Sequence, residues 1–235
     1  MKIQERERVC LELLKKLPRK FVLIGGYAAS SFDFPRFSVD LDLVIRGKDV
    51  ELFSGILKGE GFRLVKDVGD FSKFYKGGIM KFEKKVDVLP VSVYLFMDMI
   101  QARQTDAAYS FEYLWKNSEI RKTVGIGVKD DVEARVANRE MLIALKINSM
   151  RMADQRDIIS LCNGSIDVTK VLNHLKRVDK EKILNHIDIL VTTLEKPESK
   201  DSIKGVFGIS DQVYKRMIDK AKKEILSIRK GISMR

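Results

Sequence analysis

The chain begins with alternating and helical hydrophobic patterns that predict a mixture of strands and helices. Residues 21–24 form a short apolar run, and every second residue is apolar from Phe37 to Ile45. Both patterns predict strands, the second with one buried face. Helical spacing of apolar residues predicts helices at the charged N-terminus and over residues 48–60. The apolar stripes of these helices are Leu11, Leu13, Leu14 and Leu17, and Leu52, Phe53, Ile56 and Leu57.

Lysines and aromatic residues interleave from Phe71 to Phe82, around a Gly77-Gly78 pair that predicts a hairpin turn. A ribbon of this composition can stack bases and meet phosphates. Lysines on an edge strand also discourage aggregation between sheets, and half-buried rings also serve packing. Both interpretations stay open at this point.

The pattern then changes to long helical segments. We expect irregular helix over 94–115 and a short strand or hairpin over 121–128, with a domain boundary near residue 130. The helices expected beyond it are 133–152, 155–162, 168–177, 180–194 and 210–228, with a loop from Pro197 to Ser202. The predicted fold class is therefore α+β. A mixed-sheet domain over 1–130 precedes a helical domain over 131–235.

Two aspartates interrupt the alternating segment. Asp40 and Asp42 are two positions apart, so on a strand their side chains project to the same side. Like charges on one face repel, and a divalent cation bound by carboxylates and substrate phosphates relieves that repulsion. The pair therefore predicts a binding site for Mg²⁺ or Mn²⁺.

A glycine pair, Gly25-Gly26, follows the first predicted strand and precedes an expected helix at Tyr27. A strand–glycine–helix junction lets backbone N–H groups approach a polyphosphate closely. A third acidic residue, Asp87, lies in the segment Lys85–Pro90, which we expect to be a short strand. If that strand lies beside the Asp40 strand, three carboxylates gather at one edge of the sheet. Otherwise Asp87 is a surface residue near Lys84 or Lys85.

These segments resemble the signatures of the DNA polymerase β-like nucleotidyltransferase superfamily. The family has a glycine pair after an apolar residue, an alternating acidic pair, and a single acid between apolar residues. Arg36 and Ser38 also match the pattern that precedes the family's acidic pair.

The segment from Met141 to Leu161 is similar to the helical motif of AbiEii-type nucleotidyltransferases, some of which are toxins of toxin–antitoxin systems. Lys146, Arg151, Arg156 and Asp157 match the motif, whereas Ser160 stands where a second aspartate is usual. Lys146 and Asp157 are eleven residues apart, which is roughly 16 Å along an unbroken helix. A break near Met152–Gln155 would bring them closer.

The resemblance implies transfer of a nucleotide from a metal-bound nucleoside triphosphate to an acceptor hydroxyl. The implied metal ligands are Asp40, Asp42 and Asp87, and these three with Lys146 and Asp157 form the implied catalytic set. The implied nucleotide-binding residues are Gly25, Gly26, Ser30, Arg36, Ser38, Lys146 and Arg151. The acceptor expected is RNA, in particular tRNA, and a cognate antitoxin protein is a further implied partner.

Two other function classes stay open. One is transfer to a protein or a small molecule. The other is a catalytically idle member of the fold that acts as a binding module. The loss of the motif's second aspartate at Ser160 favours the idle member, whereas the presence of all three N-terminal carboxylates favours an enzyme.

Composition agrees with a partner that carries phosphates. The formal net charge is +11, from 44 basic and 33 acidic residues, and basic residues are dense from Lys215 to Arg235. A solvated helix face explains that density equally. We expect a cytoplasmic protein, because no apolar stretch is long enough to span a membrane and no signal peptide is apparent. Cys10 and Cys162 are expected to be reduced, and His174 and His186 to lie outside any zinc site.

Overall fold

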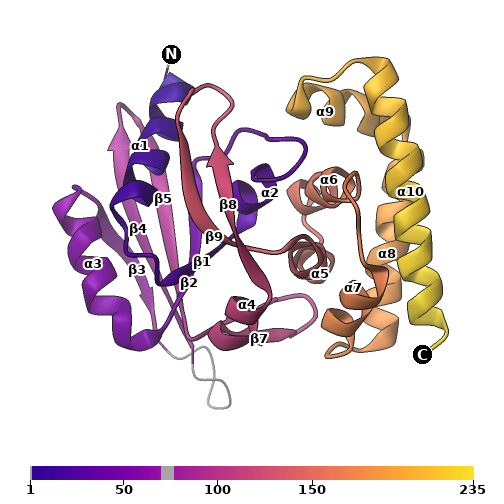
Figure 1. Cartoon of the computed structure of the whole chain (residues 1–235), viewed down its shortest axis with the longest axis horizontal. Helices are drawn as coiled ribbons and strands as arrows, with labels where there is room; N and C mark the ends of the chain where they lie inside the picture. The colour runs from indigo at the N-terminus through magenta and orange to yellow at the C-terminus, as the bar shows by residue number, and fades with distance from the viewer. Residues whose placement is uncertain (1, 70–76) are drawn as a thin grey trace. The chain divides into compact units, whose positions relative to one another are not determined.

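The computed structural model describes residues 2–69 and 77–235. The chain divides into two compact units. The first comprises residues 1–31, 35–100 and 109–138, and the second comprises residues 32–34, 101–108 and 139–235. The first contains the sheet and the second is helical, as Figure 1 shows. The α+β class predicted from the sequence is confirmed.

The first unit is built on a seven-stranded mixed sheet with the strand order β3-β4-β5-β2-β1-β9-β8. Its central strand β2 runs antiparallel to β1 and parallel to β5. The strands are β1 (Phe21–Ile24), β2 (Asp40–Ile45), β3 (Arg63–Val68), β4 (Gly78–Val86), β5 (Leu89–Met97), β8 (Ser118–Val124) and β9 (Asp131–Ala137). Two short strands, β6 (Met99–Gln101) and β7 (Ala108–Ser110), form a separate small sheet.

Helices cover one face of the large sheet. They include α1 (Lys2–Lys16) and, after the 3₁₀ turn η1 (Gly47–Asp49), α3 (Val50–Gly59). The predicted apolar stripe of α1 is buried. The ring of Phe21 on β1 meets that of Phe53 on α3 edge-on, with centroids 6.3 Å apart. This face carries the core of the unit, in which Leu23, Leu41, Leu43, Val93, Leu95 and Phe82 are fully buried.

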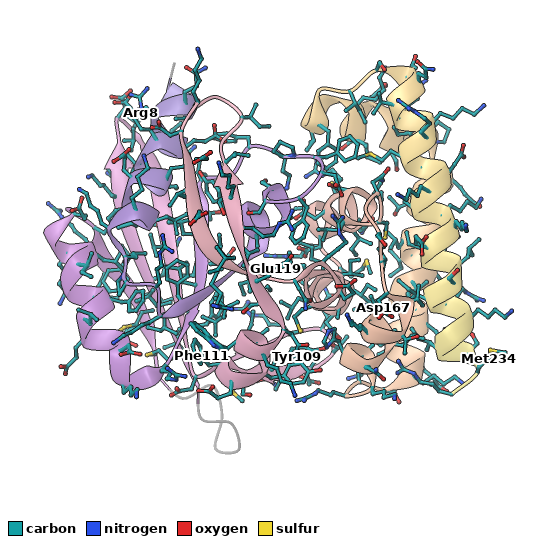
Figure 2. All side chains as sticks on the ribbon, viewed as in Figure 1. Arg8, Tyr109, Phe111, Glu119, Asp167 and Met234 are labelled. Atoms are coloured by element: carbon teal, nitrogen blue, oxygen red, sulfur yellow. The ribbon has the colours of Figure 1, made fainter. Side chains whose placement is uncertain are left out.

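The other face is covered in part. Helix α2 (Gly25–Ser30) packs against β1 and β2, and α4 (Phe111–Lys116) packs against β1. Phe111, labelled in Figure 2, is buried at the start of α4, and the Arg46 guanidinium lies 4.7 Å from its ring centroid. On β3, β4 and β5 this face carries half-buried and exposed side chains, apart from the buried Ser92.

The second unit is built from six helices among its described residues. They are α5 (Arg139–Ser149), α6 (Met152–Leu161), α7 (Val168–Leu175), α8 (Lys180–Glu195), α9 (Pro197–Phe207) and α10 (Asp211–Ser233). Their facing apolar stripes form a core that includes Leu142, Ile158, Val171, Ile187 and Ile225. Among the helices of residues 2–69 and 77–235, none is both long and apolar enough to cross a membrane.

Three predicted elements differ in the structure. Residues 131–137 form strand β9 instead of the start of a helix, so the second unit resumes at Arg139 and not at the predicted boundary of 130. The segment 94–115, expected to be helical, supplies the end of β5, the strands β6 and β7, and most of α4. The loop predicted from Pro197 to Ser202 is helical, because proline is well suited to the first turn of a helix.

Strands β3 and β4 pair antiparallel, but the glycine pair does not take the place predicted for it in a hairpin turn. Gly78 opens β4 and pairs with Met97 of β5. Most of the proposed lysine and aromatic ribbon, from Phe71 to Lys76, lies outside the described residues.

Candidate active site

The glycine pair forms the tightest part of the candidate site. Gly25 directly follows β1 and adopts a φ of +74°, a conformation that side-chain-bearing residues rarely adopt. A Cβ atom at Gly25 would lie 1.9 Å from Oδ2 of Asp42. The antiparallel register explains this approach, because Ile24 pairs with Asp42. Position 25 therefore accepts only glycine without displacement of the Asp42 carboxylate.

Gly26 is packed in the same way against the loop that precedes β2. A Cβ atom there would lie 2.6 Å from Oγ of Ser38 and 3.0 Å from Nη2 of Arg36. The structure thus brings together five of the residues that the sequence singled out: Gly25, Gly26, Arg36, Ser38 and Asp42. They combine a carboxylate, a guanidinium and a hydroxyl around the glycine backbone, a combination suited to a metal-bound phosphate.

Asp40 and Asp42 both lie on β2, as predicted, with the fully buried Leu41 between them. Asp40 is exposed and Asp42 is half-buried, so the two carboxylates lie on the less covered face of the sheet. Their oxygen atoms are ligands that Mg²⁺ and Mn²⁺ accept, and the absence of a Cβ at Gly25 lets the Asp42 carboxylate lie against the backbone there. The residues present therefore fit a divalent cation.

Ser30 has a supporting position. Its hydroxyl donates to the carbonyl of Arg36 at 3.0 Å and accepts from the Arg36 N–H at 3.2 Å. The side chain is almost wholly buried. Ser30 therefore fixes the loop that carries Arg36, and direct phosphate contact by Ser30 stays a prediction.

Asp87 lies in a different element from the one predicted. Val86 closes β4 and Leu89 opens β5, so Asp87 occupies the turn between them, exposed and with a φ of +55°. Strand β5 does lie beside β2, but the residues of β5 that pair with Asp40 and Asp42 are Ser92 and Tyr94. The Lys85–Pro90 strand is therefore corrected to a hairpin turn.

The predicted third metal ligand is not supported by a cluster of donor groups. Within residues 2–69 and 77–235, no group of three or more His, Cys, Asp or Glu side chains is arranged to hold a metal ion. Asp87 as a metal ligand or general base stays a prediction. Glu83 on β4 was missed from the sequence. It pairs with Ser92 across the sheet and forms an ion pair of 2.5 Å with Lys81.

In the second unit, a helix break does separate Lys146 from Asp157, but it lies before the expected position of Met152–Gln155, which is the first turn of α6. Helix α5 ends at Ser149, Met150 adopts a φ of +46°, and α6 begins at Met152. The break brings Nζ of Lys146 to 2.5 Å from Oδ2 of Asp157. The two side chains therefore approach one another across a helix break, as a break in this region of the chain allows.

A third member of this cluster, Asp154, was missed from the sequence. Its Oδ1 atom lies 3.3 Å from Nζ of Lys146, and its Oδ2 atom accepts from Nε of Arg151 at 2.8 Å. The side chains of Lys146, Asp154 and Asp157 are only 5%, 3% and 1% exposed, whereas that of Arg151 is exposed. The sequence signal for Asp154 was its place in the first turn of an expected helix, where an acidic side chain is favoured.

Charge balance explains how this cluster tolerates burial. Burial opposes ionisation of Asp154, but the charge of Lys146 and the hydrogen bond from Arg151 outweigh it and lower the pKa of that carboxyl. The two carboxylates together neutralise the Lys146 ammonium and the Arg151 guanidinium. This arrangement holds α5 and α6 in place, and contact of Lys146 or Arg151 with a nucleotide stays a prediction. Ser160, in place of the motif's second aspartate, is buried and donates to the carbonyl of Phe34 at 3.5 Å.

Neither cysteine nor histidine takes part in these clusters. Cys10 and Cys162 are buried and free, and burial raises the pKa of each thiol to about 12. Both thiols are therefore unreactive at neutral pH.

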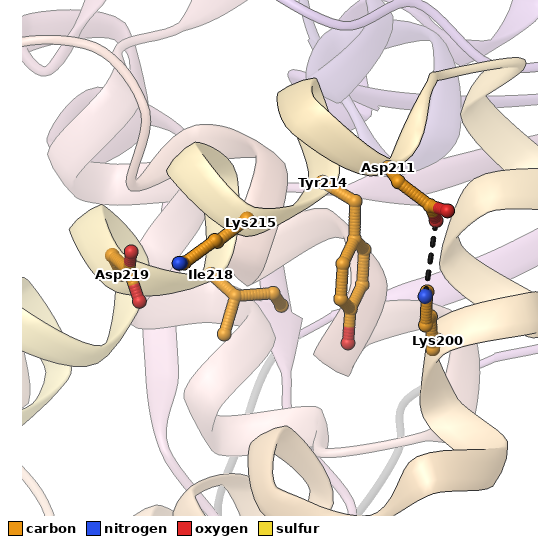
Figure 3. A pocket seen from close by; sticks show the side chains of 6 residues that line it. All are labelled: Lys200, Asp211, Tyr214, Lys215, Ile218 and Asp219. Carbon is orange, nitrogen blue, oxygen red and sulfur yellow. Dashed lines mark ion pairs between the residues drawn. The ribbon is translucent and has the colours of Figure 1, made fainter.

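A cavity of about 330 Å³ lies between α9 and α10, and Figure 3 shows the side chains that line it. The Lys200 ammonium lies 3.0 Å from Asp211. The lining residues are Lys200, Asp211, Tyr214, Lys215, Ile218 and Asp219. They include none of the predicted site residues, and we assign this cavity no role.

Two crystal structures from Helicobacter pylori are similar to this chain. The first is of a proposed nucleotidyltransferase, with a TM-score of 0.54 and 16% sequence identity, covering 99% of this chain and 96% of that one. The second is of JHP933, with a TM-score of 0.50 and 16% identity, covering 99% of this chain and 92% of that one. No known family profile matches the sequence, and no curated protein is similar to it.

At this level of identity, the likeness shows the fold. The chain has the nucleotidyltransferase fold, and its glycine pair and acidic pair lie together where the sequence signatures predicted them. The narrower AbiEii-type assignment stays a prediction.

Proposed function

We propose that this protein is a metal-dependent nucleotidyltransferase that moves a nucleoside monophosphate from a nucleoside triphosphate to a hydroxyl group of RNA. The observation that carries the proposal is the approach of Gly25 to Asp42. A positive φ and a would-be Cβ contact of 1.9 Å leave backbone and carboxylate facing one another without an intervening side chain. If Gly25 served only to form a tight turn, there would be no reason for two carboxylates to lie on the same open face of the sheet.

Asp40 and Asp42 would hold Mg²⁺ or Mn²⁺. Such a cation, when bound, neutralises phosphate charge and polarises the phosphoryl group that is attacked. Asp42 lies against Gly25, so a triphosphate bound at this junction would meet both a carboxylate that can hold the metal and the backbone of the glycine pair. Arg36 adds a fixed positive charge, since Ser30 holds its backbone from both sides.

The transfer forms a bond between the acceptor oxygen and the α-phosphorus and breaks the bond from that phosphorus to the bridging oxygen. Pyrophosphate leaves with the electron pair of the broken bond. The acceptor's proton passes to a carboxylate, a role that we give to Asp87, or to solvent. Most of the rate enhancement comes from positioning and charge neutralisation, as in phosphoryl transfer generally.

We assign Lys146, Arg151 and Asp157 to the same function on the strength of their family motif. The helix break that unites Lys146 with Asp157 supports a positioning role for the carboxylate. The AbiEii-type assignment, with a toxin activity and an antitoxin partner, rests on this motif. Ser160 marks the point at which the chain departs from the motif.

The proposal is tested by incubating the purified protein with Mg²⁺ or Mn²⁺, each α-labelled nucleoside triphosphate, and total RNA or tRNA. We expect label in RNA with one or more nucleotides and none with the Asp40→Asn/Asp42→Asn double variant. Label in a protein band or a small molecule would keep the reaction and change the acceptor. Absence of label together with absence of metal-dependent nucleotide binding would favour an idle binding module.

A further inference from the structure

The side of the sheet opposite α1 and α3 continues from the acidic pair across three further strands. Register places Asp42, Tyr94, Lys81 and Lys66 in one row across β2, β5, β4 and β3, and Asp40, Ser92, Glu83 and Arg63 in the next. Paired residues on neighbouring strands project to the same side. We call the part formed by Arg63, Lys66, Lys81, Lys85, Tyr94 and Phe96 the open sheet face.

Burial confirms that the two sides of this region differ. On the covered side, Val93, Leu95 and Phe82 are fully buried. On the open sheet face, Tyr94, Phe96 and Lys81 are half-buried, and Arg63, Lys66 and Lys85 are exposed. A sheet that needed only a core would not place two large rings on its uncovered side.

The two rings form a stacking surface. Tyr94 and Phe96 lie with their centroids 6.4 Å apart and their planes at 25°. Nζ of Lys81 lies 5.3 Å from the centroid of the Tyr94 ring. Since Tyr94 pairs with Asp42 on the adjacent strand, the ring begins about 5 Å from the acidic strand.

The charge on this face suits a phosphate backbone. Arg63, Lys66, Lys81 and Lys85 contribute four positive charges, and Glu83, which pairs with Lys81, contributes one negative charge. Positive side chains interleaved with aromatic rings are the combination that binds single-stranded nucleic acid, because rings stack on unpaired bases while cations follow the backbone. A duplex keeps its bases stacked inside and offers them to no such surface.

We propose that the open sheet face binds the single-stranded end of the RNA acceptor, with a base stacked on Tyr94 and Phe96 and phosphates beside Lys66 and Lys81. This inference rests on the proposed function for its choice of RNA over DNA. It places the end of the strand next to Asp40 and Asp42, where the acceptor hydroxyl has to arrive. The contacts themselves need no nucleoside triphosphate and no turnover.

Binding is therefore measured without nucleotide, by fluorescence anisotropy with a labelled single-stranded RNA of about 12 nucleotides, a usual site size for such surfaces. We expect Tyr94→Leu to weaken the Kd at least about fivefold and Tyr94→Phe to retain binding, because phenylalanine keeps the ring. We expect Lys66→Ala to weaken binding and lower the salt slope of log Kd by about 0.7, the value for one lost contact with a single strand. Lys58→Ala, which removes an exposed lysine on α3, is the charge-matched control.

Three results would overturn the inference. One is an unchanged Kd in both Tyr94→Leu and Lys66→Ala. Another is an equal loss in Lys58→Ala, which would indicate binding by net charge alone. The third is binding of a DNA strand of the same sequence as tightly as RNA, which would overturn the choice of RNA. Because Lys66 is exposed, Lys66→Ala decides the matter even if Tyr94→Leu fails to fold.

The experiments distinguish a failure of this inference from a failure of the proposed function. Wild-type protein that transfers nucleotide while its RNA binding ignores these substitutions would retain the function and reject the open sheet face. Protein that binds RNA through Tyr94 and Lys66 but transfers no nucleotide would do the reverse.

Discussion

Gly25 and Asp42 face one another so closely across β1 and β2 that a single methyl group at position 25 would lie 1.9 Å from the Asp42 carboxylate. Residues that are seventeen positions apart in the chain are thus held in contact by one turn and one pair of strands. The turn requires a positive φ at Gly25, so both the backbone conformation and the space depend on glycine.

Gly25→Ala is expected to abolish metal-dependent nucleotide binding and to lower the free energy of unfolding by more than about 1 kcal/mol, because alanine is strained at positive φ. Gly208→Ala is the matched control. Gly208 has a φ of +62°, but beyond its neighbours in the chain no atom of the described residues lies within 4 Å of its would-be Cβ. Both variants carry the conformational cost, and only Gly25→Ala should lose nucleotide binding. Equal nucleotide binding by the two variants would show that the Asp42 contact is irrelevant.

Asp87→Asn is expected to lower transfer by about 10² or more if this carboxylate accepts the acceptor's proton, since general bases contribute roughly that factor. Thermal melting should be near that of the wild type, because Asp87 is exposed in a turn. Asp67→Asn, an exposed substitution on β3, is the control. Full activity in Asp87→Asn would remove Asp87 from the site and direct attention to Glu83 on the neighbouring strand.

Lys146→Met is expected to destabilise the protein by about 3–5 kcal/mol, because it leaves two buried carboxylates without their shared cation. Asp157→Asn should cost less, since Lys146 keeps Asp154 at 3.3 Å. Chemical denaturation of both variants measures the difference. A larger loss in Asp157→Asn than in Lys146→Met would contradict this account of the charge balance.

The pH dependence of stability should reveal His174. Burial lowers the pKa of this imidazole, with Arg177 and Lys170 acting in the same direction and Glu140 opposing them. The folded state therefore favours neutral His174, and its contribution to stability is present above the unfolded pKa of about 6.5 and is lost as pH falls. We expect the free energy of unfolding to decrease from pH 7 to pH 5 and His174→Gln to flatten that decrease. An identical slope in the variant would assign the effect to other groups.

The sequence predicted the parts of the site that lie close together along the chain. The apolar run of residues 21–24, the glycine pair after it and the alternation that leads into residues 40–45 each predicted the local structure correctly, and the antiparallel pairing of β1 and β2 then fixes their contact. Lys146 and Asp157 were also linked correctly, because only a helix break could unite them. Each of these patterns lies within a short segment of the chain and is compatible with one local structure.

Elements whose conformation depends on distant neighbours were misassigned. Residues 133–137 consist of Glu, Ala, Arg, Val and Ala, which favour a helix by composition, yet pairing with β1 and β8 makes them a strand. Asp87 resembles a strand residue between two valines but lies in a two-residue turn. The open sheet face could not be predicted, because it depends on the register of four strands that the sequence does not specify.

The most direct test of the central claim is nucleotide transfer by Asp42→Asn. The asparagine side chain has almost the same shape as that of aspartate but lacks the charge that would hold the metal. With α-labelled nucleoside triphosphate, Mg²⁺ or Mn²⁺ and RNA, we predict labelled RNA with the wild type, none with Asp42→Asn, and a variant Tm near the wild-type value. Wild-type levels of labelled RNA from Asp42→Asn, or loss of the fold in that variant, would contradict a catalytic role for Asp42.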